Sequence, residues 1–225
     1  MATSDRAVVV PPEGLPGAEQ TSLPARVEEA VEQVLIPAEA IAERVKALAD
    51  EIADVYASEG IEEILAVTIL RGAFMFAADL GRALVETGKL DVRAEFISVA
   101  TYGDEVRQAA EAEREVRVSS LPQSTWGRHV LLVEDILDQG FTLARVQRLI
   151  EDEGAPSVRI CSLMIKELPD PTPEVQAIRD ALYVAFPGFV VPDRWVVGYG
   201  TDAAGRYRML PHVCVVEEGL YQGEG

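Results

Sequence analysis

Apolar residues recur with a helical period in residues 37–60. Pro37 suits the first turn of a helix, and Gly60 follows its end. Between them the apolar positions advance by alternating steps of four and three, which places them on one helix face. These positions are Ile41, Val45, Leu48, Ile52 and Val55.

Short apolar runs rich in β-branched residues predict the strands. They lie at residues 63–72, 92–103, 130–134, 158–165, 181–186, 194–200 and 212–216. Helices are predicted between them, one over residues 142–153 and one after Gly72 with Phe74, Ala77, Ala78 and Leu80 facing inward. Runs that are apolar throughout indicate strands buried on both faces. Strands that alternate with helices indicate an α/β fold with a parallel-sheet core flanked by helices.

Two segments show neither pattern. Residues 1–25 are rich in Pro and Gly and are interpreted as a flexible leader, which leaves residues 26–225 as a single domain. Residues 104–118 are too polar to bury and too long for a tight turn. Their composition fits either a solvated hairpin or helix, or a mobile flap over a site.

One apolar run ends in clustered carboxylates, in the sequence VLLVEDILDQGFT. Glu134 and Asp135 follow the predicted strand at 130–134, and residues 138–142 lead into the next helix. Ligands of parallel α/β sheets bind at the carboxyl ends of strands. Gly140 allows close backbone approach, and the unpaired N–H groups of the helix start favour a phosphate. Two adjacent carboxylates suit ribose hydroxyls or a hard cation such as Mg²⁺.

Composition narrows the classes of function. The net charge of −18 over 225 residues disfavours nucleic-acid and anionic-membrane partners. Cys161 and Cys214 lie in apolar runs far apart, which indicates buried, reduced thiols, although a disulfide stays open. His129 and His212 have no partners at zinc-ligand spacing. No signal peptide or bilayer-spanning run is recognised, so a cytoplasmic location is predicted.

The acid pair with its short spacer and Asp-x-Gly-x-Thr loop resembles the phosphoribosyl-diphosphate (PRPP) signature of the type I phosphoribosyltransferases. Within that family, LRGAFMFAADL at 70–80 resembles the pyrophosphate loop of hypoxanthine-guanine phosphoribosyltransferases. VPDRWVVGYGTD and YRMLPHVCVV resemble their purine-binding hood, and the segment beginning at Val31 resembles their first helix. These blocks cover most of residues 31–216. The resemblance implies the type I fold, with a small hood formed by the N-terminal segment and about residues 185–225.

The resemblance implies an enzyme that transfers phosphoribose from PRPP to a 6-oxopurine with Mg²⁺, as a homodimer or homotetramer. It assigns ribose and 5′-phosphate binding to Glu134, Asp135, Asp138, Gln139, Gly140, Phe141 and Thr142. It assigns the pyrophosphate to Arg71, Gly72 and Arg208, and the metal ions to Glu134, Asp135 and Asp202. Thr101 and Tyr102 would head the flap.

The catalytic and purine-binding roles follow from the same resemblance. Asp138 would act as general base or acid at the purine N7. Lys166 would donate to the 6-oxo group, which suits hypoxanthine, guanine and xanthine but not adenine. Trp195 would stack on the base, and Val196 would meet its edge, with Asp202 near the same pocket.

Other interpretations remain for these residues when they are taken one at a time. Trp195 also fits a core aromatic, and Lys166 and Arg208 also fit surface cations. Asp202 also fits a turn. Gln139, Phe141, Met209 and the acidic flap depart from the family pattern, which bears on PRPP affinity. A PRPP or nucleotide sensor without catalysis is the alternative function.

Overall fold

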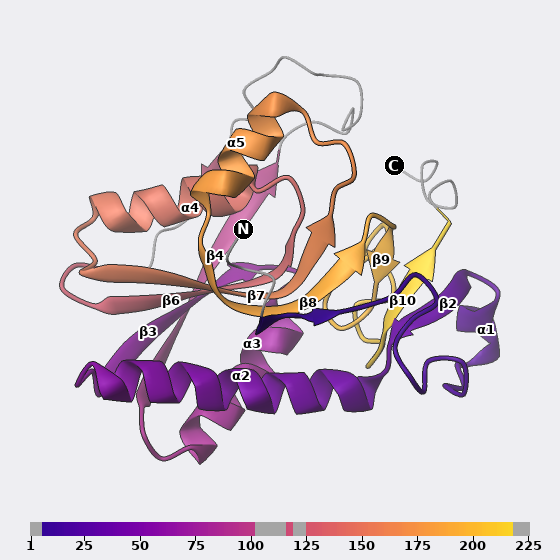
Figure 1. Ribbon diagram of the computed structural model, residues 1–225, viewed down its shortest axis with the longest axis horizontal. Coiled ribbons are helices and arrows are strands. Elements are labelled where there is room, and N and C mark those ends of the chain that lie inside the picture. Colours follow the sequence, from indigo (N-terminus) through magenta and orange to yellow (C-terminus); the bar gives the residue numbers. More distant parts are fainter. Residues whose placement is uncertain (1–5, 102–115, 119–124, 218–225) are drawn as a thin grey trace.

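The computed structural model describes residues 6–101, 116–118 and 125–217 (Figure 1). Tyr102 and nearly all of the predicted flap lie outside these residues. The elements are β1 (Val8–Val9), α1 (Ala25–Glu28), β2 (Val31–Ile36), α2 (Ala38–Ser58), β3 (Glu63–Leu70), α3 (Phe74–Glu86), β4 (Asp91–Thr101), β5 (Val116–Val118), β6 (His129–Leu137), α4 (Phe141–Asp152), β7 (Ser157–Glu167), α5 (Pro173–Ala181), β8 (Val184–Pro192), β9 (Val196–Val197) and β10 (Val213–Val216).

The main sheet has seven described strands in the order β1-β8-β7-β6-β3-β4-β5. Every neighbouring pair runs parallel except β4 and β5, which are antiparallel. The predicted α/β fold with a parallel-sheet core is confirmed. Because the parallel strands all end at one edge, the loops after β3, β6 and β7 meet there.

Helices cover both faces of the sheet: α2 and α3 on one side, α4 and α5 on the other (Figure 1). Strand β6 shows why the runs are apolar throughout. Leu131 and Val133 pack toward α2 and α3, whereas Val130 and Leu132 pack toward α4. Among the described residues, no helix has the length and apolar character that a bilayer crossing requires.

The predicted helix faces are largely confirmed. In α2, the four residues Ile41, Val45, Leu48 and Ile52 are buried, and Val55 is partly buried. In α3 the inward face is shifted. Leu80 is buried as predicted, but Ala78 is exposed, and Phe76 takes the deepest position in place of Phe74.

A second, three-stranded antiparallel sheet, in the order β2-β10-β9, forms the hood. The helix assigned by resemblance to the segment from Val31 is wrong for its first six residues, which form β2. Ile36 pairs with Val213 and Val34 with Cys214. Partners distant in the sequence therefore decide this segment, and α2 begins only after Pro37.

Residues 6–24 pack against the domain, in contrast to the flexible leader that the sequence predicts. Strand β1 pairs in parallel with β8 at the sheet edge, and Val10 is buried. The buried guanidinium of Arg44 donates to the carbonyl of Arg6 at 3.0 Å and to that of Pro187 at 2.6 Å. Two interactions therefore hold this segment: the buried Arg44 guanidinium, which needs hydrogen-bond acceptors, and the edge of β8, which pairs with β1.

Helix α5 is not among the elements that the hydrophobic pattern predicts. Thr172 caps the helix by accepting from the N–H of Val175 at 3.3 Å, and Pro173 occupies the first turn. These residues carry the standard start signal of a helix. The helix lies beside the loop that follows β6, where it bears on the site.

Candidate active site

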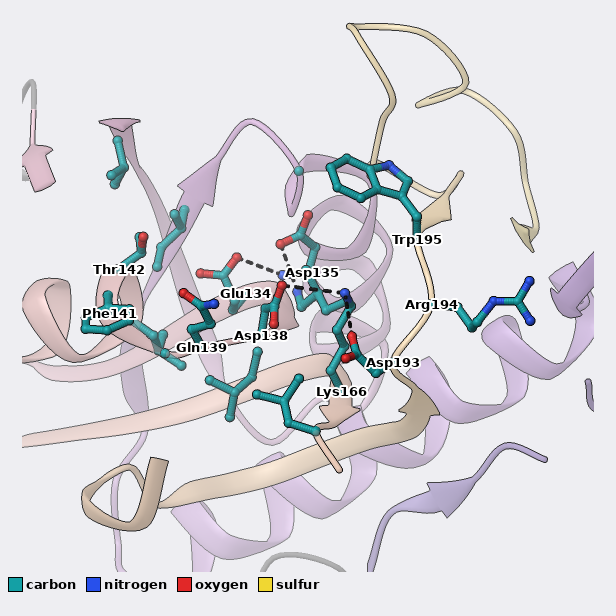
Figure 2. Close-up of a pocket in the computed structure, with 18 of the residues that line it drawn as sticks. Glu134, Asp135, Asp138, Gln139, Phe141, Thr142, Lys166, Asp193, Arg194 and Trp195 are labelled. Atoms are coloured by element: carbon teal, nitrogen blue, oxygen red, sulfur yellow. Dashed lines mark hydrogen bonds and ion pairs between the residues drawn. The ribbon is translucent and has the colours of Figure 1, made fainter. Parts of the chain in front are cut away.

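The loops after β3, β6 and β7 and the β8–β9 connection line a cavity of about 930 Å³ (Figure 2). Most of the predicted site residues meet there. The cavity is lined by Arg71, Gly72, Glu134, Asp135, Asp138, Gln139, Gly140, Phe141, Thr142, Lys166 and Trp195 from the predicted set. Segments separated by more than one hundred residues therefore form one pocket at the carboxyl edge of the sheet.

The acid pair lies inside strand β6, which continues to Leu137 instead of ending at residue 134. Glu134 is 7% exposed and Asp135 is 9% exposed. The N–H of Asp135 donates to Glu134 Oε1 at 3.2 Å, and the N–H of Ile136 donates to Asp135 Oδ1 at 2.8 Å. Burial, together with the neighbouring charge of Asp135, raises the pKa of Glu134 well above its usual value.

We expect Glu134→Gln to change how the stability of the metal-free protein depends on pH. Because the pKa of Glu134 is raised in the folded state, the folded protein binds this proton more tightly than the unfolded chain. As pH rises above the pKa of a glutamate in the unfolded chain, the free energy of unfolding of the wild type therefore falls. The variant has no carboxyl group at this position, so this loss is absent from it. The stability advantage of the variant should grow with pH above about 4.3. Urea denaturation in chelator at several pH values measures this; a difference independent of pH would contradict it.

The acid pair fits a hard cation in its chemistry. Its carboxylates are buried, adjacent and open to the cavity. Among the described residues, no group of three or more His, Cys, Asp or Glu could hold a metal by itself. A cation at this pair would therefore need further oxygen ligands, such as water molecules or a bound phosphate, as Mg²⁺ commonly takes.

The loop after β3 fits tightly between the acid pair and the hood. The peptide between Leu70 and Arg71 is cis. A Cβ on Gly72 would lie 1.7 Å from Asp135 Oδ2, and a Cβ on Gly200 would lie 1.9 Å from the Gly72 carbonyl oxygen. Neither position has room for a side chain. Glycine is needed at both because the backbone of Gly72 lies against Asp135 and the backbone of Gly200 lies against Gly72.

The loop after β6 leads directly into the start of α4. Gly140 is the N-terminal cap residue with φ of +91°, and no side chain caps the helix. The first N–H groups of a helix have no partner within it. Since Gly140, Phe141 and Thr142 line the cavity, the start of this helix could accept an anion such as a phosphate there.

Lys166 lies between two carboxylates at the cavity wall (Figure 2). Its Nζ is 3.5 Å from Asp138 Oδ2 and 3.2 Å from Asp193 Oδ1, and its side chain is 13% exposed. The ammonium of Lys166 therefore lies close to the Asp138 carboxylate. The two groups predicted to contact N7 and the 6-oxo group of a purine are neighbours.

The hood contributes Trp195, which is 40% exposed and lines the cavity. Its carbonyl accepts from the N–H of Val216 at 3.0 Å. Val196 is buried and pairs with Val215 between β9 and β10, and it is not among the lining residues. The stacking candidate therefore reaches the cavity, whereas its neighbour does not.

Asp202 and Arg208 lie in the hood outside the cavity lining. They form an ion pair at 2.6 Å, and Arg208 Nη1 donates to the carbonyl of Gly200 at 2.7 Å. Since Gly200 abuts Gly72, the pair is linked to the loop after β3 without lining the cavity. Thr101 ends β4, and Tyr102 lies outside the described residues.

Sequence reasoning missed several residues of the site. Asp193, Arg194 and Glu32 also line the cavity, and the last two form an ion pair. Tyr199 donates to Asp79 Oδ2 at 2.5 Å, which joins the hood to α3. Asp193 lies in the segment VPDRWVVGYGTD, two residues before Trp195, so its place near the site could have been inferred. No local pattern in the sequence pairs Tyr199 with Asp79.

Comparisons with known proteins agree with this geometry. The phosphoribosyl transferase domain model matches residues 37–182. The hypoxanthine-guanine phosphoribosyltransferase of Mycobacterium avium is 34% identical over 85% of this chain and 89% of its own length. The hypoxanthine phosphoribosyltransferase of Escherichia coli (strain K12) is 35% identical over 80% and 93%. A solved structure of a mutant hypoxanthine phosphoribosyltransferase from Trypanosoma cruzi, complexed with the product IMP, has a TM-score of 0.73 at 31% identity, covering 86% of this chain and 95% of that one. With the acid pair, the loop after β6 and Lys166 in one cavity, the chain belongs to the hypoxanthine-guanine phosphoribosyltransferases of the phosphoribosyltransferase family.

Proposed function

We propose that this enzyme transfers the phosphoribosyl group of PRPP to N9 of a 6-oxopurine, giving IMP or GMP and pyrophosphate. The observation that carries the proposal is the position of Lys166, 3.5 Å from Asp138 in a cavity that also holds the acid pair and Trp195. A purine stacked on Trp195 would present N7 and the 6-oxo group on one edge. Asp138 and Lys166 would supply an acceptor and a donor to these two atoms.

PRPP would lie along the loops at the sheet edge. The 5′-phosphate would bind the N–H groups of residues 138–142, and the ribose hydroxyls would bind the carboxylates of Glu134 and Asp135. The pyrophosphate would bind main-chain donors at Arg71 and Gly72. We assign Arg208 to the pyrophosphate and Asp202 to a second Mg²⁺. Both lie in the connection between β9 and β10, which would have to move toward the cavity for these contacts to form.

The chemistry forms the bond from C1 of the ribose to N9 while the bond from C1 to the pyrophosphate oxygen breaks. The proton on N7 of the incoming base passes to the Asp138 carboxylate. The negative charges of Glu134 and Asp135 would stabilise the positive charge that develops on the ribose. A bound Mg²⁺ would offset the charge of the pyrophosphate as it leaves.

Mg²⁺ is the proposed cofactor, and the acid pair is its proposed site. The other partners that we propose are PRPP, a 6-oxopurine and further copies of this chain in a homodimer or homotetramer. A cytoplasmic location is proposed because Cys161 and Cys214 are both free and buried. The flap role of Thr101 and Tyr102 also remains a proposal.

The function is tested with PRPP and Mg²⁺ and each purine base in turn, followed by pyrophosphate release and nucleotide formation. We expect hypoxanthine or guanine to react and adenine to react poorly. Lys166→Met should lower kcat/KM for the 6-oxopurine roughly 10- to 100-fold, because a charged donor to a buried carbonyl is lost. Lys46→Met removes an exposed lysine of α2 and serves as the control. Binding of PRPP without turnover for any base would favour the sensor instead.

A further inference from the structure

Strands β6 and β7 pair up to the residues just before the two proposed purine contacts. Glu134 pairs with Ser162, Ile136 with Met164 and Leu137 with Ile165. In the same register the next pair would be Asp138 with Lys166, but the pairing ends before it. The backbone ladder therefore does not fix the distance between these two residues.

Arg179 of α5 bridges the two chain segments at this point. Its Nη2 donates to the carbonyl of Lys166 at 2.7 Å, and its Nη1 donates to the carbonyl of Asp138. A weaker contact of 3.5 Å joins Nη1 to the carbonyl of Leu137. One planar guanidinium thus bonds the backbone of both proposed purine contacts, at the position where the ladder stops.

The C-terminal end of α5 packs against the loop after β6. A Cβ on Gly140 would lie 2.9 Å from Leu182 Cδ1 and 3.2 Å from Ile178 Cγ2, the residue before Arg179. Partial burial of Arg179 disfavours its charged form and lowers its pKa, while the nearby charge of Asp138 acts in the opposite direction. Both apolar contact and hydrogen bonds from α5 therefore meet the loop from the side away from the cavity.

We propose that Arg179 is a positioning residue that sets the spacing of Asp138 and Lys166, and so the placement of the purine edge. The inference rests on the proposed roles of these two residues. Arg179 is not among the residues that line the cavity, so it would act through them and not on the substrate. Its planar fork holds two carbonyls at once, which a lysine ammonium does not reproduce.

The test uses Arg179→Met and Arg179→Lys, with Arg148→Met on α4 as a matched control because Arg148 is exposed. We expect Arg179→Met to lower kcat/KM for the 6-oxopurine roughly 100-fold, as a displacement near 1 Å does. Its melting temperature should stay within about 4 °C of the control. Arg179→Lys should recover only part of the loss. Amide hydrogen exchange in the peptide spanning residues 136–144 should be faster in Arg179→Met than in the control.

Four results would overturn the inference. These are unchanged exchange in residues 136–144, full activity of Arg179→Met, full recovery in Arg179→Lys, and a loss of activity that only follows a fall in melting temperature. A wild-type protein that forms no nucleotide from any base would defeat the proposed function instead. In that case the exchange measurement still decides whether Arg179 holds the loop.

Discussion

Asp138→Asn should lower kcat roughly 100- to 10,000-fold, the usual contribution of a positioned general acid or base. The amide keeps the shape of the side chain but does not accept the purine N7 proton. The Asp138 side chain is 49% exposed, so the substitution should change the free energy of unfolding little. Steady-state kinetics with saturating PRPP and Mg²⁺, together with urea denaturation, measure the two quantities.

Asp193→Asn separates proton transfer from the ion pair with Lys166. Asp193 lies at a similar distance from Lys166 Nζ, 3.2 Å against 3.5 Å for Asp138. Asp138→Asn and Asp193→Asn each remove one negative charge beside the Lys166 ammonium. Only Asp138→Asn also removes the proposed base. We expect Asp193→Asn to alter KM for the purine more than kcat. An equal fall in kcat for the two variants would assign the effect to Lys166 and refute the role of Asp138.

Gly72→Ala should lower kcat/KM roughly 100-fold. The new methyl group would lie 1.7 Å from Asp135 Oδ2 and 2.6 Å from its Cγ, so the carboxylate must move. Asp135 is 9% exposed and its other oxygen accepts from the N–H of Ile136, so it has little room to move. Overpacking of this kind costs about 1 to 3 kcal/mol. Kinetics at varied PRPP and Mg²⁺ concentrations should show the loss.

Gly81→Ala is the matched control for that substitution. Gly81 lies inside α3, and a Cβ there meets nothing within 4 Å. Alanine in a helix interior is favoured over glycine by about 1 kcal/mol, so this variant should be slightly more stable and fully active. Normal activity in Gly72→Ala would show that the acid pair tolerates displacement, contrary to its proposed role at the ribose.

The sequence was sufficient for the inner strands of the main sheet, but not for β1 or β5 at its edges, and for most of the cavity lining. Strands β3, β6 and β7 are buried on both faces, so their apolar runs are continuous and easily recognised. The site residues lie in the last part of these strands or in the loops that follow them, at the carboxyl edge of the sheet. Glu134, Asp138 and Lys166 therefore line one cavity, although the sequence indicated Lys166 only through the family resemblance.

The hood was less predictable because its strands depend on distant partners. Strand β2 is followed at once by a strong helical pattern, and only its pairing with β10 makes it a strand. The contacts of Tyr199 with Asp79 and of Arg179 with three carbonyls join residues far apart in sequence. Local periodicity carries no information about such contacts. Helix α5 is different, because Thr172 and Pro173 are local start signals that can be recognised in the sequence.

The short strand β1 has a practical consequence for work with shortened versions of this protein. It covers the outer edge of β8, whose backbone groups would otherwise be available to another molecule. Exposed strand edges promote intermolecular pairing. Removing residues 6–10 would also deprive Arg44 of the Arg6 carbonyl. Trimming the N-terminus past Arg6 therefore carries a risk of aggregation, even though the cavity lies elsewhere.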